Sequence, residues 1–445
     1  MGVLGLGENA LFLLSFINMT LTEKIIDVSN VISWSYLYEV LFFQIHLCTE
    51  SENGLVTLVT NHPLLLAVIS ALGDTSLGNV KFAIDTLVAL CGDQMGLNAV
   101  FSNQCTTAMQ NVMAKSDSAR FNVYELIVKV SLLGDMALGM VSNSGLLDSL
   151  TAEVTTGDIL TQLNALELLT PLALSRGGMN LLLEAGVISK LQYLLSLAET
   201  DPMAALLMPG LIKFFGNMAF SRPHKMVEEF SFVILMVLRV ASGKLDLGDT
   251  TLQTVAIETV AHICSTPEGK LALGKFKVEM DEVLDVLGSM MRTAPTDQRV
   301  RVMEALTQLF YLQVDNRTEE LLQMLELWWA GVGGVNLEKI TAVAQQPFPD
   351  IHCAALSLLN ALASMPWGQR LIFSEPGLIE YILNRSTETE KQGKECKWNI
   401  VGTLLHSQTS AFTYPEGFVV KLTKYFNEGP FYVETVVEVA LEGEQ

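Results

Sequence analysis

Three neighbouring pairs of histidine and cysteine are the residues whose types could hold a metal ion. They are His46 with Cys48, His262 with Cys264, and His352 with Cys353. Side chains two positions apart on a helix point to nearly opposite sides, whereas two ligands of one metal favour the i, i+4 spacing. Because cysteine is among the most frequently buried residue types, we interpret the pairs as packed thiols beside hydrogen-bonded imidazoles. We therefore expect no metal site and no cofactor.

Motifs for nucleotide binding and for catalysis are poorly supported. The run 5–10, GLGENA, matches the dinucleotide-binding fingerprint, but only four residues precede Gly5 where that motif needs a strand. The chain contains no G-x-x-x-x-G-K-[ST], G-x-S-x-G or H-E-x-x-H pattern. A Ser-His-Asp site built from distant residues stays open as an alternative, with nothing pointing to one. We predict that the chain is not an enzyme.

Amphipathic helices are the elements that must position these side chains. Apolar residues recur with the i, i+3, i+4, i+7 spacing of one helix face, for example at Val123, Leu126, Ile127 and Val130, and at Leu211, Phe214, Phe215 and Met218. The best strand pattern is 418–422. Two uncharged stretches long enough to cross a membrane, 53–73 and 94–114, contain turn or polar residues, so we read each as two helices joined by a turn. The predicted fold class is all-α.

The helices recur with a period. Taking the residue that ends each long helix as an anchor, the anchors are Leu90, Val130, Ala173, Ala219, Ile263, Phe310 and Ala363. Their spacings are 40, 43, 46, 44, 47 and 53 residues, close to the roughly 40–47 residues of HEAT and armadillo repeats. The turn at Gly178 also returns at Gly368. We predict a HEAT/armadillo-like helical-repeat solenoid over residues 35–445, with about 7–9 repeats at this period, and an atypical N-terminal segment over residues 1–34 that packs less regularly.

Composition limits the classes of partner. The 445 residues are 50% hydrophobic and 17% charged, with a formal net charge of −21. An acidic chain is a poor ligand for nucleic acid or for an anionic membrane, because both bind through lysine and arginine. Six cysteines without a C-x-x-C pair suit a reducing compartment, so we expect the cytoplasm, with the nucleus as a second location. The expected partner is a protein with a basic face.

Five polar residues near the anchors are candidates for binding such a partner. They are Glu167, Lys213, Asn217, Glu304 and Gln308. Because residues four apart share a helix face, we predict that they form one polar stripe on the inner surface of the array. The alternative is a solvated face without a partner.

Two other features bear on the binding surface. Asn217 resembles the asparagine of the armadillo concave face, but the equivalent positions in the other repeats lack one, so no peptide-binding asparagine ladder is expected. For the adjacent Trp328 and Trp329 we favour core packing of at least one ring, with a binding hot spot as the alternative.

Several longer segments carry a resemblance to one family. They read QPFPDIHCAAL at 346–356, LMPGLIKFFGN at 207–217, VYELI at 123–127 and EGPFYV at 428–433. The chain from about Ser35 to its end resembles the family of 26S proteasome non-ATPase regulatory subunit 5, whereas residues 1–34 do not.

The resemblance implies a chaperone for assembly of the base of the proteasome regulatory particle. It implies a helical-repeat protein that binds AAA ATPase subunits, chiefly regulatory subunit 7 together with regulatory subunit 4, through their C-terminal region. It also implies release before or as the mature particle forms, hindrance of premature docking on the core particle, and no catalytic residue, small-molecule substrate or cofactor. The alternative is a general armadillo-type protein-binding adaptor.

Overall fold

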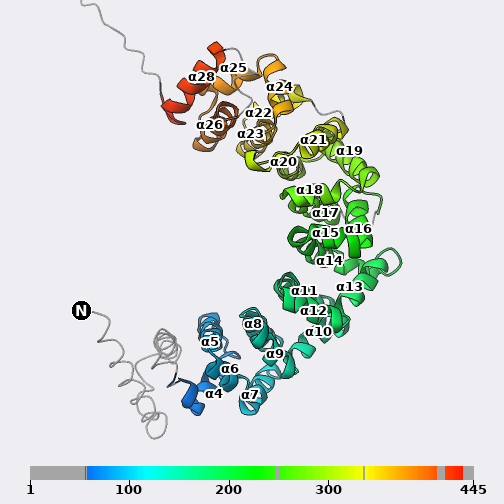
Figure 1. Cartoon of the computed structure of the whole chain (residues 1–445), viewed down its shortest axis with the longest axis vertical. Helices are drawn as coiled ribbons and strands as arrows, with labels where there is room; N and C mark the ends of the chain where they lie inside the picture. Colours follow the sequence, from blue (N-terminus) through cyan, green and yellow to red (C-terminus); the bar gives the residue numbers. More distant parts are fainter. Residues whose placement is uncertain (1–55, 57, 246–249, 334–335, 408–415, 434–445) are drawn as a thin grey trace, which may run out of the picture. The chain divides into compact units, whose positions relative to one another are not determined.

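The structure is a computed structural model that describes residues 56, 58–245, 250–333, 336–407 and 416–433 (Figure 1). Throughout this part of the chain the regular structure is helical, and no strand occurs in it. The all-α fold class predicted from the periodicity is therefore confirmed. The segment 1–34 lies outside the described residues.

The chain divides into two compact units, residues 1–194 and 195–445. The described helices of the first unit are α4 (His62–Ala71), α5 (Leu77–Leu90), α6 (Gln94–Val100), α7 (Asn103–Met113), α8 (Asp117–Ser131), α9 (Asp135–Asn143), α10 (Leu146–Thr156), α11 (Ile159–Leu174) and α12 (Arg176–Glu184), with α13 (Val187–Ser196) at the boundary.

The second unit begins with the longest of the described helices. Its described α-helices are α14 (Pro202–Ser221), α15 (Pro223–Glu229), α16 (Ser231–Ala241), α17 (Thr250–Ile263), α18 (Pro267–Leu273), α19 (Lys277–Thr293), α20 (Thr296–Phe310), α21 (Glu319–Gly331), α22 (Leu337–Ala344), α23 (Pro349–Ala363), α24 (Pro366–Ser374), α25 (Leu378–Leu383), α26 (Lys391–Leu405) and α28 (Glu416–Glu428). Two 3-10 turns, η1 (Val314–Asn316) and η2 (Arg385–Thr387), lie between them.

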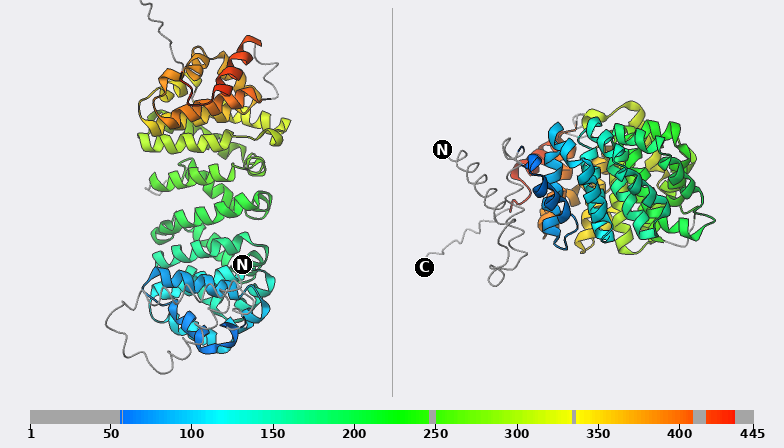
Figure 2. Two further views of the ribbon diagram at one scale, coloured as in Figure 1. Left: turned by 90° about the vertical axis from the view of Figure 1, so that its left-hand side faces the viewer. Right: turned by 90° about the horizontal axis from the view of Figure 1, so that it is seen from below.

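Long helices that recur once per repeat build one layer of each unit. In the second unit these are α14, α17, α20, α23 and α26, which we call the ladder helices, and each packs against the next (Figures 1 and 2). In the first unit α5, α8 and α11 pack in the same succession. Intervening helices such as α16 and α19 pack against the ladder helices α17 and α20. Each repeat thus buries its apolar side against its neighbours, which is how a repeat array obtains a core.

The ends of the long helices lie where the sequence predicted them. Leu90, Ile263, Phe310 and Ala363 are the last residues of α5, α17, α20 and α23, and the other three anchors lie within two residues of a helix end. Side-chain hydrogen bonds determine where several of the next helices begin. Ser175 accepts a hydrogen bond from the backbone N–H of Gly178, and Thr266 accepts one from Gly269, so the next short helix begins directly after each turn.

Glycines allow each short helix to touch the end of the preceding long helix. In four repeats a glycine lies against the carbonyl oxygen of the residue six positions before it: Gly96 with Leu90, Gly178 with Leu172, Gly269 with Ile263, and Gly368 with Leu362. A Cβ atom at any of these positions would overlap that oxygen. The recurrence of Gly178 at Gly368 in the sequence therefore reflects one packing requirement that is repeated along the chain.

Three sequence expectations about particular segments can be compared with the structure. Residues 418–422, the best candidate for a strand, belong to helix α28 instead. This helix buries Leu422 and Tyr425, which stand three positions apart. In the stretch 53–73, the expected turn lies at Asn61, which caps the start of α4. The stretch 94–114 forms the helix pair α6 and α7, as expected.

Among the described residues, one helix is long and apolar enough to cross a membrane by length and composition alone. This helix is α14, and 56% of its most apolar window is buried inside the protein. It buries Phe214 and Phe215 on adjacent positions while Lys213 stays exposed. A helix that is apolar nearly all round is typical of the core of a large protein, and each buried aromatic side chain contributes about 1.5–3 kcal/mol. Packing explains the composition of α14.

Candidate functional site

The predicted binding residues lie at the surface of the long helices. Lys213 on α14 is exposed and Asn217 is half-buried, while Glu304 and Gln308 on α20 are both exposed. Glu167 is exposed on α11, which belongs to the first unit. None of the five lies in the core. Their role in binding a partner stays a prediction.

The ladder helix α17 joins the polar rows of α14 and α20 in the second unit. Phe220 at the end of α14 stacks on His262 of α17, with ring centroids 4.2 Å apart and an interplanar angle of 18°. Arg301 of α20 pairs with Glu258 of α17 at 2.7 Å. These contacts make one continuous surface, which we call the ladder face. It consists of Lys213, Asn217, Phe220, Glu258, His262, Arg301, Glu304 and Gln308.

Helical spacing and a close helix approach produce this surface. Lys213, Asn217 and Phe220 follow the i, i+4, i+7 spacing of one helix face, and the residues of α20 have a similar spacing. Gly216 packs directly against Thr259, and a Cβ atom at this position would overlap the threonine methyl group. The small residue therefore holds α14 close to α17, so that their exposed rows adjoin.

The chemistry of the ladder face suits recognition of polar groups. The side-chain amide of Asn217 donates to the carbonyl oxygen of Lys213 at 2.9 Å, which fixes the orientation of the amide on its own helix. Partial burial lowers the pKa of His262 below its ordinary value, so the imidazole on the Phe220 ring is neutral near pH 7. The face combines an exposed cation, exposed acceptors and an aromatic pair, and it can bind a polar protein surface.

Charged side chains also lie on the long helices of the first unit, to which Glu167 on α11 belongs. The helices α5, α8 and α11 pack in order, and Lys129 of α8 lies 2.8 Å from Glu125 and 4.0 Å from Asp85 of α5. The first unit thus has its own charged row. Glu167 belongs to the first unit, so its place in one stripe with the other four residues stays a prediction.

Two of the three histidine–cysteine pairs lie within the described residues. Cys264 and Cys353 are buried, and burial raises the pKa of each thiol to about 12, far from a thiolate. His262 stacks on Phe220, while His352 hydrogen-bonds the carbonyl oxygen of Ala344 and the carboxylate of Glu388. No cluster of three or more His, Cys, Asp or Glu side chains suited to a metal occurs in the described ranges. His46 and Cys48 lie outside them.

A buried charge cluster that the sequence interpretation missed lies beside His352. Glu388 pairs with Lys397 at 2.9 Å and with His352 at 2.8 Å, and its side chain is 5% exposed. The ammonium of Lys397 also donates to the carbonyl oxygen of Tyr381 at 2.7 Å. The sequence signal is that Lys397 stands at the first position of the apolar stripe that continues with Ile400, Val401 and Leu404. A lysine at such a position is buried and needs a partner.

The tryptophan pair is part of the core. Trp328 is buried, and the half-buried Trp329 packs edge-on against Phe310 with ring centroids 5.3 Å apart. Trp367 completes this aromatic group, 6.3 Å from Trp329. Core packing, the favoured interpretation of the two tryptophans, is therefore the one that the structure supports.

Most of the chain is similar to proteins named as subunits of the proteasome. The sequence model of the family described as "Proteasome non-ATPase 26S subunit" matches residues 20–445. The human protein named 26S proteasome non-ATPase regulatory subunit 5 is 32% identical over 90% of this chain and 79% of its own length. The mouse protein of the same name is 33% identical over the same shares, and the Drosophila melanogaster protein is 26% identical over 87% of this chain and 74% of its own.

Solved structures of engineered proteins resemble this structure only weakly. An engineered protein covers 88% of this chain with 95% of its own, at 15% identity and a TM-score of 0.43. A second engineered protein covers 58% of this chain and 97% of its own, at 17% identity and a TM-score of 0.40. The match of the family model over nearly the full length, together with relatives at 32–33% identity, shows that this chain belongs to the family of proteasome non-ATPase 26S subunits.

Proposed function

We propose that this protein is a chaperone for assembly of the base of the proteasome regulatory particle. It binds the C-terminal region of AAA ATPase subunits, chiefly regulatory subunit 7 together with regulatory subunit 4, in the cytoplasm and the nucleus. Its family membership supports a role with the proteasome. Its action is binding, without catalysis, cofactor, nucleic acid or membrane.

The observation that carries this proposal is the continuity of the ladder face. Polar side chains from α14, α17 and α20 meet across repeats through the Phe220–His262 stack and the Glu258–Arg301 pair. A surface that spans several repeats can bind a folded domain, because repeat proteins present extended binding faces. A face built within one helix would suit only a short peptide.

The proposed mechanism is steric. A repeat protein that holds the C-terminal region of an ATPase occupies space beside the tail with which the ATPase docks on the core particle. The chaperone therefore hinders premature docking by its bulk. Binding of core particle must then weaken binding of the chaperone by the same factor, because coupling between two ligands of one protein is reciprocal.

A pair of variants tests whether the ladder face is the binding surface. We expect the double variant Glu304→Ala/Gln308→Ala to weaken binding of a purified ATPase C-terminal domain about tenfold, since both polar contacts are lost. The matched control is Glu319→Ala/Gln323→Ala, which removes an exposed glutamate and an exposed glutamine four positions apart on α21, outside the ladder helices. Equal affinity of the two double variants, measured by calorimetry, would contradict the assignment of the face.

A mixing experiment tests the steric mechanism. The chain, the ATPase C-terminal domain and purified core particle are combined in pairs and together, and the complexes are resolved by size. We expect binary complexes but no stable complex of all three. A stable ternary complex with unchanged affinities would leave only a scaffolding role. If the chain instead bound proteins unrelated to the proteasome and did not bind the ATPases, the result would favour a general armadillo-type adaptor.

A further inference from the structure

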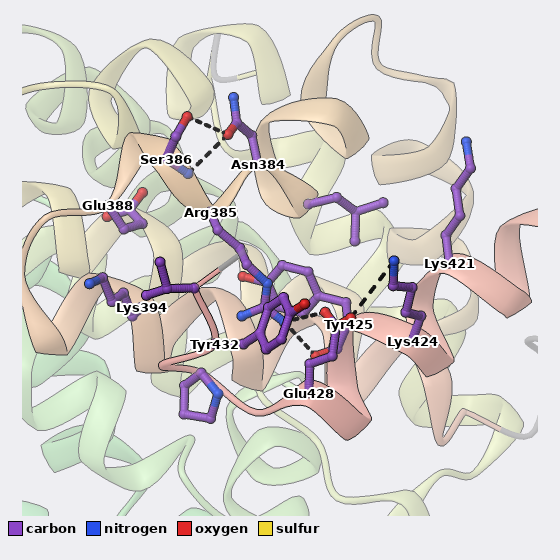
Figure 3. A pocket seen from close by; sticks show the side chains of 13 residues that line it. Asn384, Arg385, Ser386, Glu388, Lys394, Lys421, Lys424, Tyr425, Glu428 and Tyr432 are labelled. Carbon is purple, nitrogen blue, oxygen red and sulfur yellow. Dashed lines mark hydrogen bonds and ion pairs between the residues drawn. The ribbon is translucent and has the colours of Figure 1, made fainter. Parts of the chain in front are cut away.

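A cavity of about 670 Å³ lies at the C-terminal end of the second unit, away from the ladder face (Figure 3). Its lining comes from the segment around η2, the first turn of α26, one side of α28 and the residues that follow α28. The lining residues that matter for its chemistry are Arg385, Lys394, Lys421, Lys424, Tyr432 and Val433.

The charge of this cavity is opposite to that of the whole chain. Four cationic side chains line it, against the two carboxylates of Glu388 and Glu428, in a protein with a formal net charge of −21. Glu388 is already paired with the buried Lys397 at 2.9 Å. The cavity is therefore a local basic site on an acidic protein.

Arg385 builds the wall of the cavity. Its guanidinium donates to the carbonyl oxygens of Tyr425 and Gly429, each at 2.7 Å, and lies 3.7 Å from the centre of the Tyr425 ring. It also pairs with Glu428 at 3.4 Å, so one of the two carboxylates is engaged. The arginine thus fixes α28 against η2 and keeps the cavity open between them.

The lysines at the rim remain available to a ligand. Lys424 lies 3.8 Å from Glu428, a long ion pair, whereas Lys394 and Lys421 have no ion pair within the described part of the chain. Figure 3 shows Lys421 and Lys424 extending from α28 at one end of the cavity and Lys394 extending from α26 at the other end. Beside them, Tyr432 and Val433 expose apolar surface. The cavity offers several ammonium donors next to an apolar wall.

We propose that this cavity binds an acidic peptide segment of a partner protein, one that carries an aliphatic or aromatic side chain between its carboxylates. The carboxylates pair with Lys394, Lys421 and Lys424, and the apolar side chain packs on Tyr432 and Val433. Charges of the rest of the chain that lie beyond about 8 Å are largely screened at physiological ionic strength, so the local basic site decides the interaction. The site is separate from the ladder face and does not depend on the proposed chaperone role.

The test uses the full chain and a fluorescein-labelled hexapeptide of sequence Glu-Glu-Leu-Glu-Phe-Glu, with binding followed by fluorescence anisotropy. We expect Lys394→Ala/Lys421→Ala to raise the Kd of the peptide about tenfold or more, because two charge-assisted contacts are removed. The matched control is Lys275→Ala/Lys277→Ala, which removes the same charge from two exposed lysines elsewhere in the second unit. Far-UV circular dichroism of both variants should equal that of the parent.

Four results would overturn the proposal. The first is equal binding of the peptide in which every glutamate is replaced by glutamine, and the second is an equal loss of affinity in the two double variants. The third is displacement of the peptide by equimolar inorganic phosphate, which would make the cavity a simple anion site. The fourth concerns residues 434–445, which carry four glutamates and no lysine or arginine. Peptide binding only after their removal would make that segment the occupant.

Discussion

The ion pair of Glu388 and Lys397 shows how charged side chains can be buried in this fold. The Lys397 side chain is 0% exposed and that of Glu388 is 5% exposed, so both charges are removed from water. Burial by itself raises the pKa of Glu388, but hydrogen bonds from His352 and Lys397 lower it below its ordinary value. Burial lowers the pKa of Lys397, and Glu388 opposes that shift. Removing either partner would leave an uncompensated buried charge.

The first prediction concerns the pH dependence that His352 confers. Its hydrogen bond with Glu388 raises the pKa of His352 above the ordinary 6.5. A raised folded-state pKa adds stability that is fully present below the unfolded pKa and is lost as pH rises through the folded pKa. We therefore expect the free energy of unfolding lost in His352→Asn to be larger at about pH 6 than at about pH 8. Urea unfolding at the two pH values measures it.

The choice of pH isolates the histidine. The pKa of Glu388 is lowered from 4.5, so its contribution is lost only as pH falls through that lower value, and it stays ionised at both pH values of the experiment. His224→Asn, at an exposed histidine in the same unit, is the control and should show no such difference. A loss in His352→Asn that is independent of pH would show that the imidazole contributes packing alone.

At the scale of helices, the contact between a short helix and the end of the preceding long helix defines the repeat. Gly96 of α6 and Gly178 of α12 each lie against a backbone carbonyl oxygen of the long helix before them. A backbone atom cannot rotate away from an added methyl group as a flexible side chain can. The glycine is therefore required by packing, although glycine within a helix costs about 0.5–1 kcal/mol relative to alanine.

The second prediction compares two glycines in helices of the first unit. Gly96→Ala should lower the free energy of unfolding by about 1–3 kcal/mol, the usual cost of forcing atoms into a packed site. Gly139→Ala in α9 should raise it by about 0.5–1 kcal/mol, because a Cβ atom there meets nothing within 4 Å and alanine favours the helix. Urea unfolding monitored by circular dichroism checks both. Changes of the same sign would refute the packing argument.

At the scale of the whole molecule, the dominant property is the excess of acidic residues. The formal net charge is −21, and several ion pairs lie at the surface, such as Arg370 with Glu326 at 3.8 Å, whose side chains are both more than half exposed. Such pairs contribute little to stability, about 0–1 kcal/mol each. An excess of like charge acts at longer range than an ion pair when the salt concentration is low, and there it steers the approach of a partner of opposite charge.

The third prediction follows for the proposed ATPase partner. The association rate constant of the chain with an ATPase C-terminal domain should fall about tenfold or more as salt rises from about 0.05 M to about 0.5 M, because the field that steers encounter is screened. The dissociation rate constant should change much less, since contacts within the formed complex are short-range. Stopped-flow fluorescence separates the two constants. A salt effect confined to dissociation would mean that steering is absent.

The sequence by itself determined the helical class, the period and the ends of the long helices. These properties are local: apolar spacing, capping residues such as Ser175, and glycines such as Gly178 act within one helix and its turn. The one strand pattern, 418–422, failed because burial of Leu422 and Tyr425 in α28 outweighed the local preference for a strand. The family resemblance is likewise carried by the sequence and is borne out by the match of the family model. That match begins at residue 20, so the expectation that residues 20–34 fall outside the resemblance is wrong.

Only the tertiary structure decided which side chains meet across repeats. Glu258 with Arg301, and His352 with Glu388, are 43 and 36 residues apart, and no local pattern specifies such pairs. The basic cavity arises in the same way, from lysines of α26 and α28 that packing places on opposite sides of one opening. The physical reason is that the repeat period fixes which helices are neighbours, whereas the rotation and spacing of each helix depend on how its side chains fill the core. Rotation of a helix by a single residue, about 100°, would bring a different row of side chains to the surface.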